Sequence, residues 1–226
     1  MIGGMKVRSV SLAFVSSVLF AALVANSGSV GATTSSATAL SAAGYQALTS
    51  GDASKAVPLF TQSIESRELV PDALANVLLN RALAYQQLAE HGKAIDDYTA
   101  ALNLDAMTTE LRARVLYNRG LAQQKAQHAA LAIEDFTSAL LINSSFSYAY
   151  LARANALREN GQYLFSISDY ERALKYKHPD AAHVYYGEAQ AYQALKRPAE
   201  AKNLLQAAVK ADGNFAPAQE LSLIHI

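Results

Sequence analysis

Three arginines recur along this chain, and each stands sixteen residues before an aspartate. The pairs are Arg81 with Asp97, Arg119 with Asp135, and Arg153 with Asp169. Opposite charges at a constant separation can form ion pairs between two structural elements, each contributing up to about 1 kcal/mol if exposed. Alternatively, the arginines could bind an acidic ligand.

Two further segments of the same pattern help to choose between these alternatives. They have Ala43 and Glu188 at the arginine position, and Leu59 and Leu204 at the aspartate position. Because arginine and aspartate are present together or absent together, we favour structural ion pairs within each segment over ligand contacts.

The sequence has none of the motifs that carry common enzymatic chemistry. It lacks a phosphate-binding glycine-rich loop, a nucleophile elbow and a pair of histidines around a glutamate. Since it has no cysteine, it has no disulfide, thiolate zinc site or cysteine nucleophile. We therefore expect no enzymatic activity, no cofactor and no metal site. Three histidines are interpreted as solvated turn residues, namely His91, His128 and His178.

The composition is that of a globular chain with balanced charge. Among 226 residues there are 19 basic and 19 acidic groups, and 51% of the residues are hydrophobic. A nucleic-acid-binding protein needs lysines and arginines gathered on one face. Because the charges here are few and interspersed, we expect no nucleic-acid partner.

The charged pairs belong to a longer pattern that recurs five times. Each copy has a small residue on its expected first helix, and these are Gly44, Ala82, Gly120, Ala154 and Ala189. A second small residue follows twelve positions later, at Ala56, Ala94, Ala132, Ser166 and Ala201. Four positions further on stand Phe60, Tyr98, Phe136, Tyr170 and Leu205. The last column is again small, with Ser63, Ala101, Ala139, Ala173 and Ala208.

The spacing of the copies predicts pairs of helices. Successive copies are 38, 38, 34 and 35 residues apart, which is the range of helical repeat arrays. Apolar residues have helical spacing in both halves of a copy, and nothing alternates with period two. Small residues are expected where two helix backbones approach closely, with the aromatic ring filling the space beside them.

This array resembles tetratricopeptide repeats, whose signature is matched by Ala82, Tyr85, Ala94, Tyr98 and Ala101. It departs from that signature in having no tryptophan and no proline at the end of a copy. The resemblance implies an all-α fold, a right-handed α-solenoid of about five antiparallel helix hairpins. The hairpins are expected at residues 37–69, 72–106, 109–144, 147–179 and 181–213, with the start of a further helix at 214–220.

The resemblance also implies that the first helices of the hairpins line a concave groove. Its expected lining combines amides, which can bond to a peptide main chain, with aromatic rings and a few basic groups. The residues are Asn80, Leu83, Gln86, Arg114, Tyr117, Asn118, Leu121, Gln124, Tyr148, Leu151, Asn155, Arg158, His183, Tyr186 and Gln190. Asn80 and Asn118 could begin an asparagine ladder along an extended peptide, or they could be merely solvated.

The first residues have the order of a secretory signal. Basic residues precede the apolar stretch from Val10 to Ala25, and small and polar residues follow it. We expect residues 1–32 to be a signal peptide cleaved after Ala32, with Ala25 as the second choice, and the product to be a soluble periplasmic protein. A membrane anchor is the alternative, although the stretch is shorter than the roughly 20 residues of a spanning helix.

The last six residues, Leu221 to Ile226, are interpreted as foreign to the native protein. The sequence LSLIHI can be encoded by a transposase recognition end used in sequencing libraries, so we interpret residues 221–226 as a translated adapter. The native chain is then expected to continue beyond Glu220, and His225 would not belong to the protein.

Together these features predict a non-catalytic scaffold in the bacterial envelope that binds an extended or helical segment of another protein. We expect no membrane contact after cleavage of the signal peptide. Two alternatives stay open. One is a structural protein that forms homo-oligomers through its end repeats, and the other is the repeat portion of a longer protein with a catalytic domain.

Overall fold

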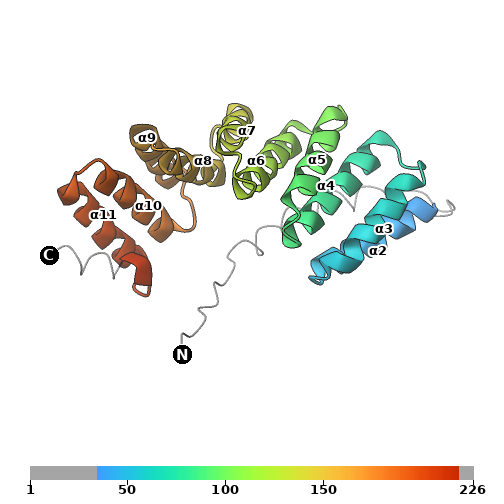
Figure 1. The fold of residues 1–226 in the computed structure, drawn as a ribbon, viewed down its shortest axis with the longest axis horizontal. Coiled ribbons are helices and arrows are strands. Elements are labelled where there is room, and N and C mark those ends of the chain that lie inside the picture. Colours follow the sequence, from blue (N-terminus) through green and yellow to red (C-terminus); the bar gives the residue numbers. More distant parts are fainter. Residues whose placement is uncertain (1–34, 219–226) are drawn as a thin grey trace. The chain divides into compact units, whose positions relative to one another are not determined.

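The computed structural model describes residues 35–218, and within this range it contains helices and no strand (Figure 1). The expected signal peptide and the C-terminal hexapeptide therefore lie outside the described residues. Bounds of the first helices of each pair are Ser36–Thr49 (α2), Pro71–Gln87 (α4), Thr109–Lys125 (α6), Ser147–Glu159 (α8) and Ala181–Ala194 (α10). The second helices are Ala53–Glu65 (α3), His91–Asn103 (α5), Ala129–Ile142 (α7), Tyr163–Lys175 (α9) and Pro198–Ala211 (α11).

Each first helix packs most extensively on the second helix that follows it, so consecutive helices form hairpins. The all-α fold of successive helix hairpins is thereby confirmed. None of the helices between residues 35 and 218 combines the length and the apolar character that crossing a bilayer requires.

The chain divides into two compact units at Ala106. Among the described residues, unit 1 holds α2 to α5 and unit 2 holds α6 to α11. In unit 1, α3 packs on α4, and α2 also contacts α4. In unit 2, α7 packs on α8 and α9 packs on α10, while α8 contacts both α6 and α10. The first helices of neighbouring hairpins therefore lie side by side within each unit.

The turn inside every hairpin has the same conformation. One residue there has a left-handed backbone, with φ between 58° and 85°, at Gly51, Ala89, Gln127, Gly161 and Lys196. The next residue donates its N–H to a carbonyl in the last turn of the first helix, for example Glu90 to Tyr85 at 2.9 Å. This is the usual C-terminal capping arrangement, in which glycine is preferred because it has no Cβ. Ala89, Gln127 and Lys196 adopt it without that preference.

Several helix starts are capped by side chains. Ser35 accepts a hydrogen bond from the N–H of Thr38 before α2, and Thr108 accepts one from Leu111 before α6. Pro71 stands in the first turn of α4, where its missing N–H costs nothing. These caps satisfy N–H groups that a helix itself leaves without partners.

The core of each hairpin consists of the small and aromatic columns found in the sequence. Phe60, Tyr98, Phe136 and Tyr170 are at most 1% exposed, and the small residues of all three columns are buried. A Cβ added to Gly120 would lie 2.6 Å from the Phe136 ring, and one added to Gly44 would lie 2.7 Å from the Phe60 ring. Since real Cβ atoms do not come so close, glycine allows these two helix pairs to approach as they do.

Replacing Gly120 with alanine should therefore destabilise unit 2. The added methyl group must displace the fully buried Phe136 ring, and overpacking of this kind costs roughly 1 to 3 kcal/mol. Urea denaturation followed by circular dichroism measures the change. Gly92→Ala in α5 is the matched control: its Cβ would meet nothing within 4 Å, so it should be neutral or stabilising by up to about 1 kcal/mol. Equal effects of both substitutions would contradict the packing argument.

Candidate peptide-binding surface

Each of the three expected arginine–aspartate pairs joins the first helix of a hairpin to its second helix. Arg81 donates from Nε to Asp97 Oδ2 and from Nη2 to Asp97 Oδ1, both at 2.7 Å. The Arg119–Asp135 pair has the same geometry at 2.8 and 2.7 Å. Arg153 and Asp169 repeat it at 2.6 and 2.8 Å. Bidentate pairs of this kind are the strong form of the charge-assisted hydrogen bond.

The arginines also contact a helix of the preceding hairpin. Arg81 Nη1 donates to Thr61 Oγ1 of α3, and Arg153 Nη1 donates to Thr137 Oγ1 of α7, both at 3.0 Å. The hydrogen bond to Asp97 raises the pKa of the Arg81 guanidinium, so this group is always charged. Because their donors are directed into helix packing, these arginines act as structural links. Sequence reasoning missed the threonines, although each stands two residues after the aspartate position of its own hairpin.

The expected groove residues of unit 2 lie on α6, α8 and α10. Eleven of the twelve are half-buried, so they form a surface that is partly shielded and still accessible. They are Arg114, Tyr117, Asn118, Leu121 and Gln124 on α6, Tyr148, Leu151, Asn155 and Arg158 on α8, and Tyr186 and Gln190 on α10. His183, on α10, is exposed. We call this set the first-helix surface of unit 2.

A buried tyrosine holds one of these amides in place. The Tyr170 ring is fully buried, and its hydroxyl accepts a hydrogen bond from Arg158 Nε at 3.2 Å. The hydroxyl proton is then donated to Asn155 Oδ1, 2.7 Å away. Burial raises the pKa of Tyr170 to about 12, so the proton is retained at neutral pH. The Asn155 carbonyl is thus engaged, and Nδ2 remains as a donor without a hydrogen-bond partner between residues 35 and 218.

The expected residues of unit 1 differ in burial. Asn80 and Leu83 on α4 are buried, at 7% and 8% exposure, whereas Gln86 is half-buried. Gln86 Oε1 accepts a hydrogen bond from the Tyr98 hydroxyl, as Asn155 does from Tyr170. Asn80 Oδ1 is buried and has no hydrogen-bond partner among the described residues. Buried polar atoms without a partner are rare, and each calls for a bound water or ligand atom.

Aromatic rings connect the helices at one side of the unit 2 surface. The ring centroids of Tyr117 and Phe146 are 5.1 Å apart, and those of Phe146 and Tyr148 are 6.4 Å apart. Tyr148 meets His178 edge to face at 4.6 Å. On α10, Tyr186 packs against Phe215 at 5.5 Å. Burial raises the pKa of both Tyr117 and Tyr148, so these tyrosines are neutral groups that offer ring area.

The interpretation of His178 as a solvated turn residue is wrong. This side chain is 7% exposed, and its Nδ1 accepts a hydrogen bond from the N–H of Asp180 at 3.1 Å. Burial lowers its pKa, so the imidazole stays neutral. His178 lies between hairpins, where Tyr148 covers it, and the adjacent Pro179 gave no indication of this burial. His91 is half-buried, whereas His128 is exposed as expected.

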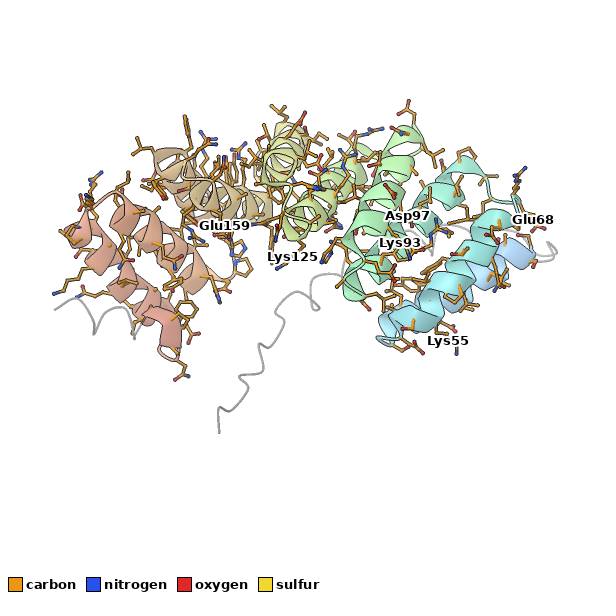
Figure 2. All side chains as sticks on the ribbon, viewed as in Figure 1. Lys55, Glu68, Lys93, Asp97, Lys125 and Glu159 are labelled. Atoms are coloured by element: carbon orange, nitrogen blue, oxygen red, sulfur yellow. The ribbon has the colours of Figure 1, made fainter. Side chains whose placement is uncertain are left out.

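The charged groups on this surface are paired with neighbours. Arg114 Nη2 lies 2.6 Å from Glu110 Oε1, and Arg158 lies 3.8 Å from Glu159. Gln124 of α6 donates to Glu159 at the end of α8, at 3.0 Å, and so joins the two first helices (Glu159 is labelled in Figure 2). No group of three or more metal-binding side chains occurs in the described part of the chain. The surface therefore offers amide donors and rings in a locally neutral setting.

Comparison with known proteins identifies the repeats. The tetratricopeptide repeat family model matches residues 75–106 and 182–215. These ranges correspond to the hairpins α4–α5 and α10–α11. No curated protein matches the chain in sequence.

Solved structures with the same fold include two named proteins. The crystal structure of MamA protein is 20% identical, with a TM-score of 0.69, and the match covers 80% of this chain and 94% of MamA. The structure of YrrB, titled a TPR protein with an unusual peptide-binding site, is 16% identical, with a TM-score of 0.68. That match covers 80% of this chain and 89% of YrrB. At these identities the likeness establishes the fold alone.

The structural role of the ion pairs can be measured with a double-mutant cycle on Arg153→Met and Asp169→Asn. Because Asp169 is only 5% exposed, removing one partner leaves the other in a dry site, and the coupling energy should be roughly 1 to 3 kcal/mol in urea denaturation. Arg197 and Glu200 form the control pair, with 50% and 39% exposure, and should couple by less than about 0.5 kcal/mol. Purely additive losses at Arg153 and Asp169 would reject the link.

Proposed function

We propose that this chain, in which residues 75–106 and 182–215 match the tetratricopeptide repeat family, is a non-catalytic scaffold that binds an extended segment of a partner polypeptide. The binding surface is the first-helix surface of unit 2. Repeat arrays of this architecture present such surfaces for partner proteins. YrrB, which has the same fold, is described as having a peptide-binding site.

The observation that carries the proposal is the fixed orientation of Asn155. Its carbonyl oxygen is held by Tyr170, so its Nδ2 donor is directed by a buried partner and loses little freedom on binding. A peptide main chain presents a carbonyl acceptor at every residue whatever its sequence. An amide donor held in this way therefore suits recognition of main chain, with sequence preference left to the surrounding rings.

Unit 1, considered by itself, offers the Asn80 carbonyl as a candidate hydrogen-bond acceptor. Oδ1 has no partner among residues 35–218, and because the atom is buried, a peptide N–H would reach it only after the side chain turns outward. Accepting that N–H is the role expected of the first member of an asparagine ladder. Since an unmade hydrogen bond at a buried carbonyl is costly, a bound peptide that supplies the N–H would gain more than it would at an exposed amide.

We also propose that the protein acts in the bacterial envelope, because basic residues precede an apolar stretch at its N-terminus. Expression of the full-length gene in a Gram-negative host should then release a shortened protein into the periplasmic fraction. Mass spectrometry of its N-terminus should begin just after Ala32 or Ala25. Recovery of the uncleaved chain from the cytoplasm would contradict this location.

Peptide binding can be tested without knowing the natural partner. A displayed library of random linear peptides is selected on the purified protein, and the selected peptides are measured by calorimetry. Asn155→Ala should weaken binding about tenfold, because it removes one main-chain hydrogen bond. Gln190→Ala at the equivalent position of α10 should have an effect of similar size.

Asn203→Ala is the matched control, since Asn203 is an exposed amide on the second helix α11. Asn203→Ala should leave both the affinity and the melting temperature unchanged. Asn155→Ala removes the acceptor of the buried Tyr170 hydroxyl and should lower the melting temperature, so its affinity is measured at a temperature where it is fully folded. The proposal fails if no peptide is selected, or if the three substitutions have equal effects. Light scattering on the same samples reports self-association, and growth in mass with concentration would favour the structural alternative.

A further inference from the structure

The last hairpin of unit 2 has the opposite charge at the position that arginine occupies elsewhere. Glu188 of α10 stands where Arg153 stands in α8. Its two neighbouring positions have changed as well. Leu204 replaces the aspartate of the second helix, and Glu171 of α9 replaces the threonine of the preceding hairpin. A site that links three helices through a cation in other hairpins thus contains two carboxyl groups here.

Glu188 is held inside the helix packing. It is 5% exposed and forms no hydrogen bond or ion pair with any described residue. Beside it, Gly187 lies so close to Tyr170 that a Cβ there would be 2.7 Å from the ring. Since α10 packs closely against α9 at this point, little of the Glu188 side chain is exposed to water while the hairpin stays docked.

Other titratable groups on the packed helices do not neutralise Glu188. From α9, Glu171 is exposed and its charge acts on Glu188. From α8, Arg158 and Glu159 both act on the Tyr170 hydroxyl. On α10 itself, Tyr192 lies near Glu188, and it is covered by Arg197, whose guanidinium pairs with Glu200 at the start of α11. Glu188 also acts on the Tyr170 hydroxyl of α9. The acidic group thus faces one like charge and the phenols of Tyr170 and Tyr192.

Burial, and next the charge of Glu171, raise the pKa of Glu188 from 4.5 to about 7. In an undocked or unfolded hairpin the side chain would be solvated and would return to the lower value. A carboxyl group whose pKa is raised by folding stabilises the folded form fully below pH 4.5, and this stability is lost as the pH rises through about 7. The relevant window is therefore pH 4.5 to 7.

We propose that the α10–α11 hairpin is a pH-sensitive end of unit 2, docked most firmly on α9 when Glu188 is protonated and loosened when Glu188 ionises. The buried Glu188, with the like charge of the exposed Glu171 nearby and no paired cation, creates this dependence, because ionisation places an unpaired charge among packed helices. Hairpins that carry arginine and aspartate at the same positions lack it.

The pH-dependent docking of the α10–α11 hairpin also affects the first-helix surface of unit 2. α10 carries Tyr186 and Gln190, so loosening the hairpin would withdraw these side chains from a bound peptide. This consequence rests on the proposed function, whereas the docking equilibrium does not. The test therefore measures docking on the free protein.

Amide hydrogen exchange, read by NMR as protection factors at pH 5 and pH 8, tests this pH-dependent docking. In the parent protein the protection factors of α10 and α11 should fall by about ten- to a hundredfold between the two pH values, since each unit of pKa shift is tenfold in the docking equilibrium. Amides of α6 and α7 should change less. Protection factors are corrected for the intrinsic pH dependence of exchange.

Two variants separate Glu188 from other groups that titrate in this range. In Glu188→Gln the fall should disappear. Glu171→Thr installs the residue type found at Thr137, on an exposed position that tolerates it, and should reduce the fall while the hairpin stays folded. The proposal is overturned if the parent and Glu188→Gln show the same ratio of protection. If Glu188→Gln does not fold, an unchanged ratio in Glu171→Thr overturns it instead.

Discussion

The close approach of a glycine on a first helix to an aromatic ring on the second helix, seen in two hairpins, is the contact on which this protein depends. Gly120 against Phe136 and Gly44 against Phe60 leave no room for a methyl group. Such a contact sets both the distance between the two helices and their register. Once these are fixed, the arginine one residue before the small position can reach the aspartate on the facing helix. Residues on the other faces of the first helix, such as Asn155 and Gln190, are then only partly buried.

The same aromatic position serves a second purpose in two of the hairpins. Phe60 and Phe136 only fill space, whereas Tyr98 and Tyr170 also carry a hydroxyl to the first helix, where it bonds to Gln86 and to Asn155. A buried residue of the core thereby positions an amide at the surface. In each of these two hairpins the tyrosine hydroxyl links the packed core to the surface amide. Changing the tyrosine to phenylalanine would keep the ring in the core and remove the hydrogen bond to the amide.

Few charged side chains lie between the packed helices, and their signs differ between the α8–α9 hairpin and the α10–α11 hairpin of unit 2. Arg153 satisfies Asp169 and Thr137 together, so three helices share one buried cation. Glu188 occupies the corresponding position without any cation. Because a buried ion is stable only when paired, the first arrangement is insensitive to pH near neutrality, while the second makes docking depend on a proton.

The sequence by itself determined the helix pairs, their buried columns and the partner of each arginine. The same residue pattern recurs in several copies, so a position that is small, aromatic or charged in one copy can be checked against the others. Only the tertiary structure decided the burial of Asn80 and His178, the contacts of arginine with Thr61 and Thr137, and the hold of Tyr170 on Asn155. The arginine–threonine contacts and the burial of His178 depend on how one hairpin lies on the next, and the hydrogen bond between Tyr170 and Asn155 depends on how α8 packs on α9. Each involves residues far apart in the chain. The sequence also did not indicate the left-handed backbone at Ala89 and Gln127. Closure of the hairpin imposes this conformation on residues that have no preference for it.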